Sequence, residues 1–134
     1  MSNAQIDRNV IDLCLGDGAE GVRQLIGDVR TLADLLRGHD IAPAHLALAQ
    51  LAQDLGALIV LVESLRAPVA TIAPAALPSP EEVEQLARTL ESIVAAQAGQ
   101  DWLTVSDVLE YDLEPALAGW LTRFESASAA LRVA

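Results

Sequence analysis

Three carboxylates lie at helical spacing near the end of the chain, and a tyrosine lies beside them. Asp107, Glu110 and Glu114 are three and four residues apart, which places them on one face of a helix, with Tyr111 beside them. Like charges so placed repel one another unless water, arginine or a cation screens them. The pattern leaves three interpretations open: a solvated face, a surface for a basic protein partner, or a cation site.

Two further observations narrow the chemistry of this segment. Carboxylate bundles that bind metals usually add a Glu-x-x-His motif, and this sequence has none, so we expect no metal and no other cofactor. Pro115 lies within the same helical pattern, cannot donate a hydrogen bond to the carbonyl of Tyr111, and predicts a kink there. We expect the surface for a partner to be formed by Asp107, Glu110, Tyr111, Glu114 and Pro115.

The surrounding segment, residues 101–120, resembles the C-terminal segment of a group of small bacterial helical proteins. That group carries the pattern Asp-x-Leu-Glu-Tyr-acidic-Leu-x-Pro-x-Leu-x-x-Trp. The matching residues here are Asp107, Leu109, Glu110, Tyr111, Asp112, Leu113, Pro115, Leu117 and Trp120. The resemblance implies a helical fold and no particular activity.

A histidine near the start of a helical segment suggests an alternative function. His45 and the helix that follows it resemble a histidine-phosphotransfer domain, a four-helix bundle in which an exposed histidine accepts a phosphoryl group. Those domains usually place lysine three residues and glycine four residues after the histidine, whereas Leu48 and Ala49 occupy these positions here. Phosphorelay signalling through His45 is therefore the alternative to a binding function.

The glycines Gly16, Gly18 and Gly21 have the spacing of a nucleotide-binding loop. Together with the preceding residues 10–13 they resemble the first motif of Rossmann-like S-adenosylmethionine methyltransferases, where a buried strand leads into the glycines. That fold needs further strands, and no stretch of this sequence alternates as a half-buried strand would. We therefore interpret the glycines as a junction between two helices, with Gly16 ending one and Asp17 capping the next.

The strongest helical pattern runs from Pro43 to about Arg66. Its apolar stripe includes Leu51, Leu55, Leu58 and Val62, and Ile59 with its neighbours leaves almost no polar side in the second half. A helix that is apolar all round is covered all round. This helix is therefore either the centre of the bundle or shared with a second subunit, and we expect a homodimer.

The remaining helices are predicted from the spacing of apolar residues and from the residues that begin or end helices. A first helix over about residues 3–15 has Ile6, Val10, Leu13 and Cys14 on one face, and a second helix ends at residue 37. The segment 67–78, rich in proline and alanine, is the one long connection. Ser79 then caps a helix that ends at Gly99, and Asp101 caps the last, kinked helix.

The amino-acid composition indicates the fold class and the kinds of partner to expect. The 134 residues suit one domain, residues 1–134, and an apolar content of 52% with 3% aromatics favours an all-α bundle of four to five helices. The chain has 8 basic residues, all arginine, against 19 acidic ones, so its net charge is −11 and we expect no nucleic-acid partner. The segment 55–62 is too short to span a bilayer, and no signal peptide is visible, so we expect a cytoplasmic protein without a membrane partner.

No complete catalytic constellation is present in the sequence. We therefore expect a non-enzymatic protein–protein interaction module, such as an adaptor, a small chaperone or an accessory protein. The alternatives that stay open are the histidine-phosphotransfer domain and a cation-binding helical protein.

Overall fold

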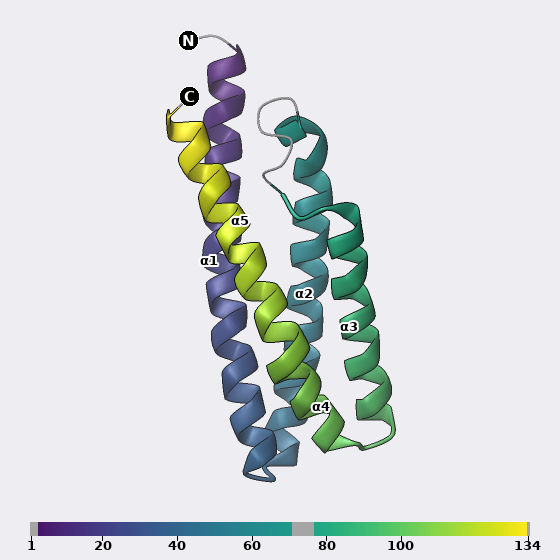
Figure 1. Cartoon of the computed structure of the whole chain (residues 1–134). Coiled ribbons are helices and arrows are strands. Elements are labelled where there is room, and N and C mark those ends of the chain that lie inside the picture. The colour runs from purple at the N-terminus through teal and green to yellow at the C-terminus, as the bar shows by residue number, and fades with distance from the viewer. Residues whose placement is uncertain (1–2, 71–76, 134) are drawn as a thin grey trace.

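The chain forms a bundle of long antiparallel helices (Figure 1). The computed structural model describes the backbone of residues 3–70 and 77–133 and the side chains of residues 8–70 and 77–131. All elements in these ranges are helical, which confirms the all-α prediction: α1 (Asn3–Arg37), α2 (Ile41–Ala70), α3 (Pro80–Ala98), α4 (Trp102–Val108), the π-helical turn η1 (Leu109–Leu113) and α5 (Glu114–Val133). Helix α1 packs against α2 and α5, and α3 packs against α4 and η1.

Two tight turns of the same design join these helices into two hairpins. Each turn has the sequence Gly-x-Asp, at residues 38–40 and 99–101. The middle residue takes a positive φ, 58° at His39 and 57° at Gln100, and the aspartate N–H donates to a carbonyl five residues back at 2.9 Å. This is the Schellman motif, whose left-handed position usually holds glycine. Both turns lie at one end of the bundle, and α1 begins and α5 ends at the other (Figure 1).

The second hairpin begins at the side-chain caps that the sequence predicts. Ser79 Oγ accepts the N–H of Glu82 at 3.1 Å, and the Glu82 carboxylate accepts the N–H of Ser79 at 3.3 Å, which completes a capping box. Asp101 accepts the N–H of Thr104 at 3.2 Å and its hydroxyl at 2.6 Å. The hydrogen bond from the Thr104 side chain, followed by that from its backbone, lowers the pKa of Asp101.

The core is aliphatic, with Phe124 and Trp120 as its large aromatic members. Each long helix contributes fully buried side chains, for example Val22 from α1, Leu55 from α2 and Ile93 from α3. Burial of one such side chain stabilises the fold by about 1.5–3 kcal/mol, so these stripes outweigh local preferences along the chain.

The predicted junction at Gly16 and Asp17 is wrong, because α1 continues through it. A glycine in a helix interior costs about 1 kcal/mol relative to alanine. The buried positions Ile11, Leu15 and Val22 nevertheless continue on one face without interruption, so packing keeps the segment helical.

The face predicted for the start of α1 is also displaced. Val10 and Leu13 are 56% and 69% exposed and Cys14 is half-buried, whereas Ile11 and Leu15 are buried in their place. The buried face is therefore rotated by about one residue from the predicted one. The side chain of Ile6, also predicted on this face, lies outside the described residues.

The predicted connection 67–78 begins later than expected, because α2 extends to Ala70 and includes Pro68. Val69 is 2% exposed, so packing holds this last turn although proline is a poor helix former. Residues 71–76 lie outside the described residues. At the far side of the connection Leu77 is buried, and its carbonyl accepts a hydrogen bond from Arg123 at 3.2 Å.

Candidate interaction site

The predicted kink in the last helix is a π-helical turn immediately before Pro115. Within η1 the N–H of Glu114 donates to the carbonyl of Leu109, five residues back rather than four. The apolar spacing explains the turn: Val105, Leu109, Leu113 and Leu117 are each four residues apart, and all are 0% exposed. Twelve residues of α-helix make about 3.3 turns and would rotate the last of them off the core by about 120°. Absorbing about one residue in a wider turn keeps all four side chains inside.

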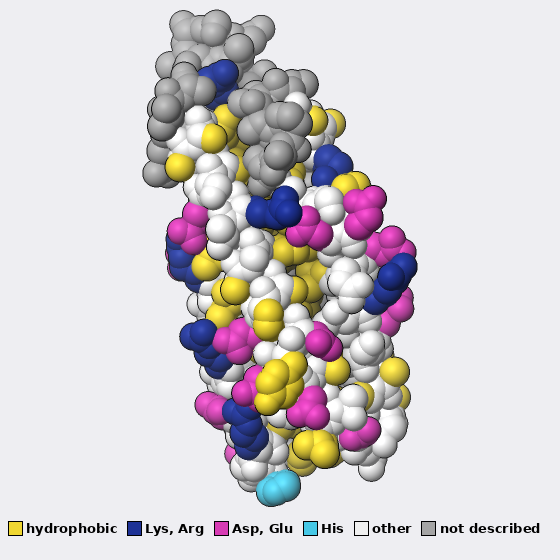
Figure 2. Space-filling model, in the orientation of Figure 1, with side chains coloured by type: hydrophobic (Ala, Val, Ile, Leu, Met, Phe, Trp, Pro, Cys, Tyr) yellow, Lys and Arg dark blue, Asp and Glu magenta, His cyan; other side chains and the backbone are white. Residues whose placement is uncertain are grey.

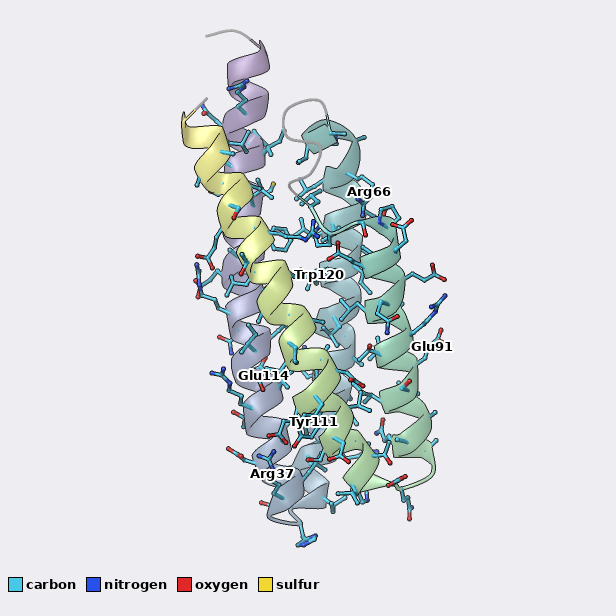
Figure 3. All side chains as sticks on the ribbon, in the orientation of Figure 1. Arg37, Arg66, Glu91, Tyr111, Glu114 and Trp120 are labelled. Carbon is cyan, nitrogen blue, oxygen red and sulfur yellow. The ribbon has the colours of Figure 1, made fainter. Side chains whose placement is uncertain are left out.

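Two of the predicted acidic residues point toward α1 and are paired there with arginine. Arg30 Nε lies 2.7 Å from Glu114 Oε1, and Arg37 forms a short ion pair with Glu110. Figure 3 labels one member of each pair, Glu114 and Arg37. The hydrogen bond that Arg37 donates to the Glu110 carboxylate, followed by the negative charge of that carboxylate, raises the pKa of Arg37. Because these arginines neutralise the two carboxylates, Glu110 and Glu114 hold α5 to α1 more than they offer charge to a partner.

The other predicted residues lie on different sides of the turn. Tyr111 is 69% exposed, and Asp107 and Pro115 are exposed as well. Tyr111 and Pro115 line a groove toward α3, and Asp112, a residue of the C-terminal motif that was not among the predicted site residues, lines it as well. The structure therefore divides the predicted surface into a paired face on α1 and an open face toward α3.

The open face is a groove of about 500 Å³ between α3 and the segment formed by η1 and α5. Small residues make it hollow, since Ala116 and Gly119 line it and a methyl group added at Gly119 would meet nothing within 4 Å. Trp120, 3% exposed, forms its floor, and apolar atoms are visible between the two ridges in Figure 2. The further lining residues are Glu82, Gln85, Leu86 and Thr89.

Charge is unevenly compensated around this groove. Glu82 is neutralised by Arg123 at 2.6 Å. Asp112 has no ion pair among the described residues, and the same holds for Asp107 one turn earlier. The groove therefore combines an apolar floor, an exposed aromatic side chain and one carboxylate, Asp112, without an ion pair among the described residues.

His45 lies at the end of the bundle that carries the two turns. Its ring packs edge-on against Trp102, with centroids 6.1 Å apart and an angle of 77°, and Gln97 Nε2 lies 3.3 Å from its Nδ1. These side chains line a pocket of about 460 Å³ that has no arginine in its walls. His45 is exposed there, without a cation of the kind that neutralises a phosphoryl group in phosphotransfer domains, and phosphorelay through it stays a prediction.

Of the three glycines of the nucleotide-loop pattern, only Gly18 lies in a close helix contact. All three lie within α1, and a methyl group added at Gly18 would come within 3.2 Å of Phe124 and 3.3 Å of Leu61. Gly18 therefore allows α5 and α2 to approach α1 closely. No cluster of three or more potential metal ligands is found among the residues that the structure describes.

The residues predicted for a central or shared helix lie in the chain's own core. Leu51, Leu55, Leu58 and Val62 are 0–6% exposed within the monomer, and Ile59 is half-buried against the same core. A contact with a second subunit would therefore need another face of α2.

The full extent of α2 also bears on the expectation of no membrane partner. Among the described residues, α2 is the one helix whose length and composition would suffice to cross a membrane, although core helices of soluble proteins meet the same criterion.

Comparison with known proteins finds no relative. No family model, curated protein or solved structure matches this chain.

Proposed function

We propose that this protein is a non-enzymatic protein–protein interaction module that binds a basic segment of its partner in the groove between α3 and α5. The observation that supports this most directly is the exposure of Tyr111 beside an apolar hollow floored by Trp120. Tyrosine and tryptophan dominate binding hot spots, because they bury a large area at a small loss of conformational freedom.

The sign of the partner's charge follows from the ion pairs of the chain. Each of the six arginines from Arg23 to Arg123 is already paired with a carboxylate of the chain itself. The net charge of −11 is therefore expressed by the remaining acids, including Asp112 on the groove and Asp107 next to it. A lysine- or arginine-rich segment with one apolar face complements this surface and would be steered toward it.

A photocrosslinking experiment in the native cell tests the proposal. With p-benzoylphenylalanine in place of Tyr111, we expect crosslinks to a discrete protein, mapped to a peptide with several basic residues. Placed at Glu91, an exposed position of α3 outside the residues that line the groove, the same probe should not give that crosslink.

Two further variants separate the charge from the apolar floor. Asp112→Asn should weaken the partner's affinity by about threefold to tenfold, and the loss should disappear at high salt because screening removes the charge contribution. Gly119→Leu should fill the groove and abolish binding. Equal crosslinking from positions 111 and 91, or a partner bound equally by the Gly119→Leu variant, would show that the groove is not the binding site.

A further inference from the structure

The outward face of α2 is an uncharged strip that lies opposite its buried stripe. Its residues are all exposed, and the two largest, Leu46 and Val60, are 76% and 64% exposed. The strip consists of Leu46, Ala49, Gln53, Ala57 and Val60. In the most apolar stretch of α2 28% of the residues are buried, and no other part of the chain that the structure describes covers the five strip residues. Exposed aliphatic side chains that share one helix face are candidates for association.

The strip is symmetric about its centre. Ala49 and Ala57 lie four residues on either side of Gln53, and Leu46 and Val60 lie seven residues on either side. When two copies of a helix pair antiparallel about a two-fold axis, the residue at a given distance before the centre meets the residue at the same distance after it. Such a pair centred on Gln53 therefore places each leucine against the valine of the other copy and each Ala49 against Ala57.

The residue types suit this arrangement. Alanine at the two inner positions allows the helix backbones to approach closely, while leucine and valine fill the space farther out. At the centre, Gln53 would meet its own copy, and an amide can both donate to and accept from an identical amide. The strip also adjoins a groove of about 330 Å³ between α1 and α2, which Ala57 shares with Gly18 and Gly21.

The strip carries no ionised group, which is what contact between two acidic copies needs. A chain of net charge −11 repels its own copies and anionic lipid alike, so contact with itself requires a surface without ionised groups. None of the strip residues is ionisable. The matched residue types on the two sides of Gln53 favour a second copy, because a membrane surface or a foreign helix would gain nothing from them.

We infer that the protein forms an antiparallel, two-fold dimer through the exposed strip of α2, centred on Gln53. This inference is independent of the groove between α3 and α5, which lies on other helices. Each dimer would therefore present two copies of that groove.

Cysteine crosslinking tests the geometry, in a chain whose single cysteine has been removed by Cys14→Ala. Gln53→Cys should form a disulfide with its own copy under mild oxidation, because the axis passes through this position. Ala42→Cys and Ser64→Cys lie eleven residues on either side, about 16 Å along the helix, so each would be about 33 Å from its own copy. Neither should crosslink alone, since a disulfide needs α-carbons within about 7 Å, but a mixture of the two should.

Sedimentation velocity tests whether the strip drives association. Val60→Glu should raise the dimer dissociation constant at least tenfold, while Leu103→Glu, at an equally exposed leucine on α4, should leave it unchanged. Added salt should tighten the dimer because it screens the repulsion between the two acidic bodies.

Several results would overturn the inference. A strict monomer at all concentrations would do so, as would self-crosslinking at position 42 or 64, which indicates a parallel pair or another register. Flotation of the monomer with phosphatidylcholine vesicles, lost in Val60→Glu, would assign the strip to a membrane instead. A dimer that survives Val60→Glu would place the interface elsewhere.

Discussion

The two hairpins of this bundle are closed by the same Gly-x-Asp turn but are otherwise built differently. The first, α1 and α2, consists of two long regular helices, and α1 runs without a break across Asp17, the cap that the sequence predicts. The second begins each helix at a side-chain cap, Ser79 or Asp101, and interrupts its last helix with a π turn. The regular helix α2 has the exposed strip on its outer face. The interrupted last helix, with its small residues, forms the groove against α3.

This difference shows two routes from an aliphatic sequence to a binding surface. On α2 the surface arises because an apolar helix has more apolar sides than one chain can cover. Between α3 and α5 it arises because Ala116 and Gly119 leave space above a buried tryptophan. Four predictions test this comparison.

The largest effect is expected where the two hairpins meet. Phe124 of α5 is fully buried and packs where Gly18 opens the surface of α1. Phe124→Ala should lower the free energy of unfolding by about 3–5 kcal/mol, measured by urea denaturation. Leu103→Ala, at a 74% exposed position, should change it by less than about 0.5 kcal/mol. Similar small losses in both variants would mean that the hairpins do not share this core.

The next prediction compares a helix start that is held by a side-chain cap with a helix that is held by packing alone. The expected change in the free energy of unfolding is smaller than for Phe124→Ala. Ser79→Ala removes the capping box of α3 and should lower the free energy of unfolding by about 1 kcal/mol. Asp17→Ala, at the cap that the structure does not form, should leave stability unchanged or slightly raised, because alanine is the better helix former. Thermal melts of the two variants measure the difference, and an equal loss in both would restore a helix boundary at Asp17.

The Gly-x-Asp turn shared by the two hairpins predicts variants with a higher free energy of unfolding. The expected gain is no larger than the loss in Ser79→Ala. His39 and Gln100 occupy left-handed positions that favour glycine, while the glycines before them do not take a positive φ. His39→Gly and Gln100→Gly should each raise the free energy of unfolding by about 0.5–1 kcal/mol. Because both turns have the same geometry, unequal signs in the two variants would contradict the equivalence of the two hairpins.

The smallest effect concerns pH. Because its folded-state pKa lies below the ordinary value of 3.8, ionised Asp101 contributes stability that is present above that value and lost as pH falls through the lowered pKa. Asp101→Asn retains a capping side chain but cannot titrate, so its melting temperature should fall less between pH 5 and pH 2. Parallel pH dependence in both proteins would show that the cap contributes no such linkage.

The sequence predicts the helical class, the caps of the second hairpin and the ends of α3, because these depend on local signals. It misses the continuity of α1, because the glycines and Asp17 resemble a helix junction, whereas the apolar spacing of Ile11, Leu15 and Val22 continues across them. The three steps of four residues from Val105 to Leu117 could have indicated the π turn.

The candidate site was predictable in part. Tyr111 and Pro115 line the groove, and the acidic motif covers the segment that forms one of its walls. Spacing along one helix cannot reveal that Arg30 and Arg37, more than seventy residues away, neutralise two of the carboxylates. It also cannot reveal the groove, which exists only because α3 forms its other wall.

The start of α1 and the end of α5 leave the bundle at the same pole, and these two helices lie against each other (Figure 1). A force applied between the start of α1 and the end of α5 would therefore separate the contacts between these helices one turn at a time. It would not load all of these contacts at once, as a shearing force does. We therefore expect unfolding at low force when the protein is pulled by the start of α1 and the end of α5. When it is held by either one, its opposite pole and its flanks stay unloaded and free to make contacts.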